Sequence, residues 1–249
     1  MVTKAGQAAK ISRRRRFTVT PARGHITTAV EDDYHCMAVT LGHDGTTITA
    51  VEPVMDRAPW TTCPGAPAVL VETFVGTALA EAAQRGFKQA NCTHLYDLTV
   101  LAAAHAGDEA PLTYDILVSD AIDGLVHAEI RCDGQVIHRI AHRDDIITAP
   151  EALAGTSLFK LRGWIDGLTG GEQEAARLLQ WGTIIAHGRA YSIDRLSDAS
   201  KMPPNCYTFQ PDNKAVAKRV GAVFDFSQGP QQPLDHLGRD GFGTRQIQQ

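Results

Sequence analysis

Apolar and polar residues alternate in two separate regions of the chain, and segments with helical spacing follow each region. The first region holds four short alternating runs, at residues 17–20, 26–30, 34–41 and 46–51. In the third run, His35 shares a face with Met37 and Val39. Because alternation with a period of two is typical of strands and the connections are short, this region predicts an antiparallel meander.

The segment from Asn91 to His105 has the spacing of a helix with one apolar face. That face consists of Cys92, Leu95, Leu98, Thr99 and Ala102. Asn91 is a favourable N-cap residue, because its side-chain carbonyl can accept a hydrogen bond from an N–H group of the first turn. Two shorter helices are predicted before it, at residues 66–76 and 77–85.

The second alternating region contains three runs, at residues 112–119, 126–132 and 136–140. Asp133-Gly134 separates the last two runs and is typical of a two-residue hairpin turn. Helical spacing returns after Thr156 and again over residues 172–186. Groups of strands followed by helices predict an α+β fold in which antiparallel sheets pack against helices within a single domain.

We expect this domain to span residues 16–226, between a flexible leader at 1–15 and a polar tail at 227–249. Hydrophobic residues make up 43% of the 249 positions, which is enough for a large core. A formal net charge of -4 argues against a protein that binds nucleic acid by bulk electrostatics. The four arginines at 13–16 are the exception. They could contact phosphate or an acidic partner, and the alternative is that they form a solvated tail.

No apolar run approaches the 18 residues that a membrane-spanning helix needs, so we expect no membrane insertion. The basic, polar start of the chain has no apolar core of a signal peptide. The five cysteines are odd in number and show no C-x-x-C spacing, which fits reduced thiols better than a disulfide framework. These features predict a cytoplasmic protein.

The candidate catalytic residues centre on His94. Asp97 lies three residues further along the predicted helix and is therefore its neighbour on the helix surface. A carboxylate beside an imidazole favours the protonated ring and fixes its tautomer, which suits a general base or acid. The structural alternative is a histidine at the edge of the core, held by a local hydrogen bond. His35 lies among apolar strand residues, so we expect it to have a partner or a pocket.

The segment 52–67 contains four prolines and is predicted to be an irregular loop. Loops on a rigid sheet often carry binding residues. Asp56 and Arg57 could bind polar groups of a ligand there, and Trp60 could cover an aromatic ring. The structural alternative is a plain connection in which Trp60 fills the core.

The chain lacks the recognised motifs for dinucleotides, nucleoside phosphates, serine hydrolases and zinc. A metal site built from His35, Cys92 and His94 is disfavoured, because helix positions 92 and 94 point about 200° apart. We therefore expect no metal and no cofactor.

Three short motifs carry a resemblance to a known family: His35-x-Met37, Cys63-Pro64 and Cys92-Thr93-His94-Leu95. From about Arg16 to Ala106 the chain resembles a bacterial family known only as a domain of unknown function. The family's usual glycine before the last motif is Asn91 here, and its frequent aspartate between the histidine and the methionine is Cys36. Such proteins look like neighbours of aromatic-compound catabolism in soil proteobacteria. The chain is similar in this respect to cofactor-free lyases that remove a hydroxymethyl group as formaldehyde from lignin-derived dimers.

This resemblance implies a cofactor-independent carbon–carbon lyase that acts on a phenolic aromatic small molecule by retro-aldol-type cleavage and releases formaldehyde. His94 would be the base, oriented by Asp97, and His35 or Tyr96 would return or relay a proton. Proton transfer requires the rings of His35 and His94 to meet across the helix–sheet interface.

Two alternatives remain open. The first is a non-catalytic binding or interaction protein that uses the arginine run and the tail. The second is a hydrolase of thioesters or esters with Cys92 or Cys63 as nucleophile. We expect a homo-oligomer, most simply a homodimer, with a small aromatic molecule as the ligand and neither nucleic acid nor membrane as a partner.

Overall fold

The computed structural model describes residues 11–187, 198–227 and 230–237, and its backbone divides into two compact units. We call the first the β2–β4 unit; it comprises residues 16–113, 191–224 and 232–249. The second is the β5–β8 unit, with residues 1–15, 114–190 and 225–231. Strand β1 (Ile11–Ala22) contributes residues to both units.

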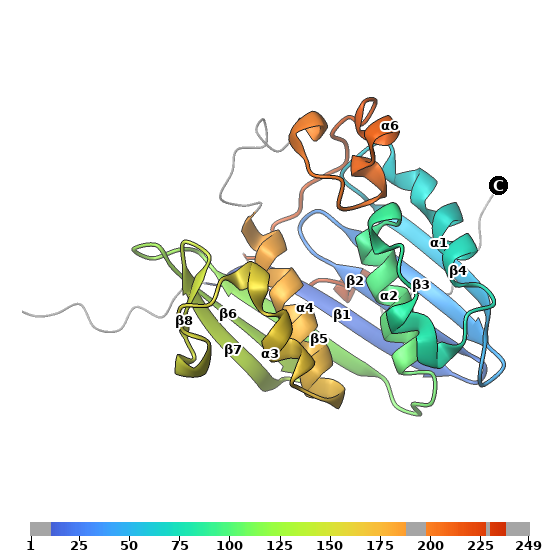
Figure 1. Ribbon diagram of the computed structural model, residues 1–249, viewed down its shortest axis with the longest axis horizontal. Coiled ribbons are helices and arrows are strands. Elements are labelled where there is room, and N and C mark those ends of the chain that lie inside the picture. The colour runs from blue at the N-terminus through green and yellow to red at the C-terminus, as the bar shows by residue number, and fades with distance from the viewer. Residues whose placement is uncertain (1–10, 188–197, 228–229, 238–249) are drawn as a thin grey trace, which may run out of the picture. The chain divides into compact units, whose positions relative to one another are not determined.

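The β2–β4 unit is built on an antiparallel meander. Strands β2 (His25–Glu31), β3 (Cys36–His43) and β4 (Ile48–Arg57) follow one another, and β2 also pairs with residues 16–22 of β1. Helices α1 (Ala66–Phe74) and α2 (Thr93–Ala104) pack on one face of this sheet (Figure 1). Short 3₁₀ helices lie between them, at Cys63–Gly65, Leu79–Gln84 and Lys88–Ala90.

The two faces of this sheet are covered differently. On the helix side, the hydroxyl of Thr28 in β2 donates a buried hydrogen bond to the carbonyl oxygen of Leu98 in α2 (2.9 Å). On the other side, Ala29, Cys36 and Ala38 form a small apolar cluster with Leu234. Residues that alternate along a strand point to opposite faces, so β3 supplies one row of side chains to each layer.

Residues of the predicted tail therefore take part in the fold. Segment 232–237, which includes the short helix η9 (Asp235–Leu237), places Leu234 at 7% exposure in that cluster. Two further short elements of the β2–β4 unit, η8 (Tyr207–Phe209) and α6 (Pro211–Lys214), lie in the region predicted to be irregular. Residues 238–249 of the predicted polar tail lie outside the described part of the chain.

The β5–β8 unit is a second antiparallel meander. Its strands are β5 (Leu112–Ser119), β6 (Leu125–Cys132), β7 (Gln135–Arg143) and β8 (Ile146–Ala149). Helix α4 (Gly170–Ala186) packs on β6 and β7, and the short α3 (Arg162–Asp166) packs on α4. Asp133 and Gly134 both have positive φ values, 48° and 82°, as a two-residue hairpin turn requires.

The α+β class with antiparallel sheets packed against helices is confirmed. The extent of a single domain over 16–226 stays a prediction. No helix in the described ranges combines the length and the apolar character needed to cross a membrane.

The prediction of a flexible leader over 1–15 is wrong for residues 11–15, which belong to β1; residues 1–10 lie outside the described ranges. Arg13 and Arg15 are 2% and 5% exposed, and the guanidinium of Arg13 donates to the carbonyl oxygen of Ile185 (3.0 Å). Alternation along a strand turns every second arginine of the run towards the interior, so the run is not a solvated tail.

The predicted N-cap of α2 is also wrong. The helix begins after Cys92, which makes no side-chain capping bond. Asn91 is fully buried instead, and its amide nitrogen donates to Thr73 Oγ1 (3.0 Å) and to the carbonyl oxygen of Phe87 (3.1 Å). The side chain therefore ties α2 to the end of α1 rather than closing its own helix.

Candidate functional site

The β2–β3 connection is organised by one buried carboxylate. Asp32 Oδ1 accepts hydrogen bonds from the backbone N–H groups of Tyr34 (2.8 Å) and His35 (2.9 Å) and from His35 Nδ1 (3.0 Å). The Asp32 side chain is 0% exposed and that of His35 is 13% exposed. Asp32 thus fixes the turn, the orientation of the His35 ring and the tautomer of that ring.

His94, in the first turn of α2, stacks on His35. The two ring centroids lie 3.9 Å apart and the ring planes are inclined by 26°. The structure therefore brings together the two histidines that the sequence analysis requires to meet. One atom each of Asp32, His35 and His94 lie within 4.8 Å of one another, so we call these three residues the imidazole cluster.

The other two predicted catalytic residues are held by different partners. Asp97 forms an ion pair with Lys88 Nζ (2.5 Å), and the carboxylate that bonds to the His35 ring is Asp32. Tyr96 is 5% exposed and packs against Phe74 with ring centroids 4.9 Å apart; burial raises the pKa of its phenol. The catalytic roles of His94, His35, Asp97 and Tyr96 stay predictions.

The three predicted substrate-binding residues separate into two places. Asp56 and Arg57 line a cavity at the end of β4. Trp60 is 5% exposed and lies in an apolar cluster with Cys63, Ala199 and Phe209. Its ring meets that of Phe209 edge-on at 5.6 Å. Trp60 therefore fills the core, as in the structural alternative, and stacking on a substrate would require this cluster to open.

The cavity beside Asp56 and Arg57 has a volume of about 410 Å³. Its remaining walls are formed by Cys36, Ala58, Gly221, Ala222, Phe224 and His236. This volume falls in the usual range of small-molecule sites. The cavity lies wholly within the β2–β4 unit.

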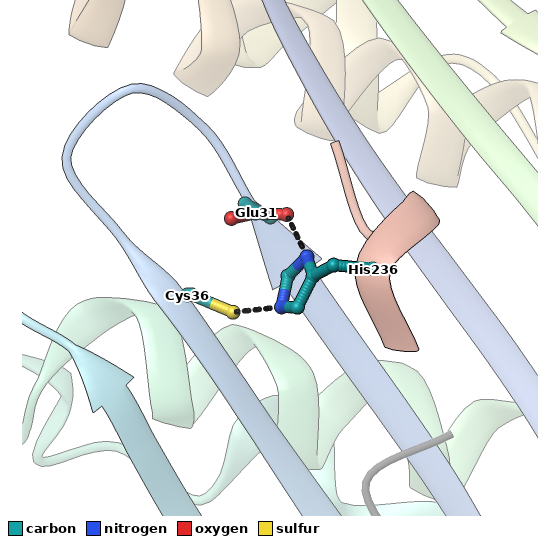
Figure 2. Close-up of side chains that lie close together, drawn as sticks. All are labelled: Glu31, Cys36 and His236. Carbon is teal, nitrogen blue, oxygen red and sulfur yellow. Dashed lines mark hydrogen bonds and ion pairs between the residues drawn. The ribbon is translucent and has the colours of Figure 1, made fainter. Parts of the chain in front are cut away.

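Two residues that line this cavity, Cys36 and His236, form a second cluster with Glu31, and no sequence pattern predicts this cluster. His236 lies between Glu31 and Cys36 (Figure 2). Its Nδ1 is 3.3 Å from Glu31 Oε2, and its Nε2 is 4.0 Å from Cys36 Sγ. We call Glu31, Cys36 and His236 the thiol cluster.

Arg57 connects the two clusters through the backbone of the hairpin. Its Nη2 donates to Glu31 Oε1 (3.0 Å) and to the carbonyl oxygens of Asp32 (2.5 Å) and His35 (3.3 Å). The ring of Phe224 covers its guanidinium at 4.1 Å. Arg57 was predicted to bind a substrate; the structure adds that it braces the turn from which both clusters arise.

The two cysteines proposed as nucleophiles are poorly suited to attack. Burial raises the pKa of Cys92 to about 12, and burial also raises the pKa of Cys63. Both thiols are therefore protonated near neutral pH, and a thiol in this form is a weak nucleophile.

The described residues also bring three ligand-type side chains together in the β5–β8 unit. His142, Asp145 and His187 place one atom each within 4.8 Å of one another. His187 Nε2 is 3.2 Å from Asp145 Oδ1. Burial lowers the pKa of His142, and the neighbouring His187 acts in the same direction.

Comparison with known proteins finds one family model that part of the chain matches. Residues 14–107 match a family model described as "Protein of unknown function (DUF2889)". The matched region runs from β1 through α2, so it contains all of the imidazole cluster and two members of the thiol cluster, but not His236. No curated protein matches the chain. The match supports a family of unknown function and leaves the chemistry to be argued from the site.

Proposed function

We propose that this protein is a cofactor-independent carbon–carbon lyase that cleaves a phenolic aromatic small molecule and releases formaldehyde. The observation that carries the proposal is the stacked pair of His35 and His94 with a buried carboxylate on His35. Retro-aldol cleavage needs only acid–base groups, and this cluster supplies two of them. The phenolic substrate class rests on the family resemblance. The cytoplasmic location and the homodimer stay predictions from the sequence.

The two imidazoles have different surroundings, and this gives them different roles in the proposed reaction. Two protonated rings stacked at 3.9 Å would repel each other, so one ring is neutral whenever the other is charged. Asp32 lies against His35 and favours the imidazolium form of that ring. His94 is then the neutral ring and the base, and His35 is the acid. Environments that separate two neighbouring titratable groups in this way are typical of acid–base sites.

The reaction follows from this division. His94 accepts the proton of a primary alcohol on the substrate, the bond between the carbinol carbon and its neighbour breaks, and formaldehyde leaves. The bonding electrons pass towards the aromatic ring or expel a phenolate. The imidazolium of His35 donates a proton to the carbon or oxygen that receives the electrons, and proton transfer between the two histidines restores the starting state.

A formaldehyde-release assay with phenolic dimers that bear a primary alcohol tests the proposal. We expect wild-type protein to release formaldehyde and His94→Ala to lose between a hundredfold and ten-thousandfold in rate, which is the usual contribution of a general base. His105→Ala is the matched control, because it removes an imidazole from the other end of α2, where His105 pairs with exposed Asp108 (2.6 Å). Equal rates in wild type and His94→Ala would remove His94 from the chemistry, and no release from any dimer would reject the lyase.

The same three side chains favour one second candidate, a lyase that uses a divalent cation. Two imidazole nitrogens and a carboxylate oxygen within 4.8 Å of one another are a donor set that suits Zn²⁺ or Fe²⁺. Activity that disappears after dialysis against a chelator and returns with one added metal would support this candidate. Full activity after dialysis would support the acid–base mechanism without metal.

A further inference from the structure

The thiol cluster has the connectivity of a nucleophile, its base and a residue that orients the base. The two nitrogens of His236 face different partners: Nδ1 faces Glu31 Oε2 at 3.3 Å, and Nε2 faces Cys36 Sγ at 4.0 Å (Figure 2). A carboxylate on Nδ1 holds the tautomer in which Nε2 can accept a proton. The thiol is the group that Nε2 faces, so a proton can pass from Cys36 to His236.

The surroundings hold this arrangement in place. Glu31 and Cys36 are directly paired across β2 and β3, and both are 1% exposed. The backbone N–H of Leu234 donates to Glu31 Oε2 (2.5 Å), and Leu234 is buried against Cys36. These contacts fix the segment that carries His236. Arg57 lies 3.0 Å from Glu31 Oε1 and holds the Glu31 carboxylate from its other side.

The cluster also has room for a substrate. Cys36 and His236 both line the cavity of about 410 Å³, and Arg57 and Phe224 form further parts of its wall. A site that only fixed the C-terminal segment would need Leu234 and Glu31, but it would not need an imidazole placed between a carboxylate and a thiol at the edge of a cavity.

We propose that Cys36, His236 and Glu31 form a nucleophilic thiol site that accepts an acyl group from a small ester or thioester bound in this cavity. This site is separate from the imidazole cluster, and its activity does not depend on the proposed lyase reaction. Cys36 is the nucleophile, His236 the base and Glu31 the positioning residue.

The reaction balances with water as the only co-reactant. His236 Nε2 takes the proton of Cys36 Sγ, the sulfur bonds to the carbonyl carbon, and the bond from that carbon to the leaving oxygen or sulfur breaks. The proton on His236 passes to the leaving group. Water, deprotonated by the same imidazole, then hydrolyses the acyl–sulfur bond, which returns the thiol and a carboxylic acid.

The test uses p-nitrophenyl acetate with the full chain at pH 7, followed by peptide mapping. We expect an acetyl group on Cys36 and p-nitrophenolate released with it. The other four cysteines provide internal controls, because the proposal assigns His236 as base to Cys36 alone and burial raises the pKa of each of the other four thiols. Acetylation of Cys36 should be at least about tenfold faster than that of Cys206, because His236 Nε2 faces Cys36 Sγ and can take its proton.

Variants identify the base. We expect His236→Ala to slow acetylation of Cys36 about a hundredfold, as loss of a general base does. Cys206→Ser should leave the rate unchanged. Leu234 and its hydrogen bond to Glu31 remain in His236→Ala, so the segment stays docked, and an unchanged thermal unfolding midpoint checks this.

Two results would overturn the proposal. One is acetylation of Cys36 at the same rate in wild type and His236→Ala, and the other is the absence of acetyl on Cys36 while another cysteine is modified. Formaldehyde release is measured separately with His94→Ala, so failure of either proposal leaves the other standing.

Discussion

Replacement of Asp32 by asparagine tests how much the fold and the site depend on one charge. Asparagine keeps an oxygen that can accept the three hydrogen bonds of Asp32 Oδ1, from Tyr34 N, His35 N and His35 Nδ1, at 2.8, 2.9 and 3.0 Å. A hydrogen bond to a charged group contributes about 1.5–3 kcal/mol and one between neutral groups about 0.5–1.5 kcal/mol. The difference is about 1 kcal/mol for each bond, so we expect Asp32→Asn to lower the free energy of unfolding by about 3 kcal/mol.

Asp44→Asn is a matched control from the next hairpin. Asp44 Oδ1 accepts from Thr46 N (2.9 Å), Thr46 Oγ1 (3.0 Å) and Thr47 N (2.8 Å), so it makes the same number of bonds at similar distances. This carboxylate is exposed, and water screens its charge. We therefore expect a much smaller loss of stability than in Asp32→Asn.

Urea denaturation of the two variants, with equal m-values as a check on two-state behaviour, measures both losses. In addition, the proposed mechanism predicts that Asp32→Asn lowers the rate of formaldehyde release by more than the loss of folded protein explains, because the asparagine no longer carries the negative charge beside His35. Similar losses of stability in the two variants would refute the argument that burial of the Asp32 charge organises the hairpin.

Three further predictions concern other parts of the chain. Gly182→Ala should lower the unfolding free energy by about 1–2 kcal/mol in urea denaturation, because its Cβ would lie 2.9 Å from two carbons of Ile116. Gly171→Ala in the same helix is the control and should not lower it, because the nearest neighbour of its Cβ lies at 4.0 Å. Burial lowers the pKa of His142 below 6.5, so stability should be fully present above pH 6.5 and decrease as the pH falls below it; thermal unfolding of His142→Phe should show a weaker dependence. Iodoacetamide at pH 7 should leave Cys92 unmodified in folded protein and label it in urea, as peptide mapping would show, because its pKa is raised to about 12.

Local patterns in the sequence were sufficient for most of the secondary structure. The alternation in 34–41 predicts β3, and Asp133-Gly134 predicts the turn between β6 and β7. Both predictions succeed because each signal is contained within a few consecutive residues. The predicted lengths and types of individual elements were less accurate. The predicted strand at 17–20 is part of a strand of 12 residues, and the predicted helix at 77–85 is a 3₁₀ helix over Leu79–Gln84.

Residues whose role depends on distant partners were beyond this reasoning. Asn91 is of a residue type that is preferred at N-caps, yet its amide donates to Thr73, 18 positions earlier in the chain. Arg13 looks like part of a solvated run, yet its partner Ile185 lies 172 positions away. Hydrogen bonds of this kind leave no periodic signal. The proposed proton transfer requires His35 and His94 to meet, but the sequence does not predict that they do; the structure places their ring centroids 3.9 Å apart.

The β2–β3 hairpin supplies neighbouring residues to both clusters. Adjacent residues at the end of a strand point to opposite sides, so Glu31 joins the layer that contains His236 while Asp32 turns towards His35 on the helix side. Arg57 donates to the side chain of Glu31 and to the backbone carbonyl of Asp32 with the same nitrogen, and this holds both carboxylates in position. Because the two acids face different layers, substitution of Glu31 should act on the thiol cluster and substitution of Asp32 on the imidazole cluster, whereas substitution of Arg57 should affect both.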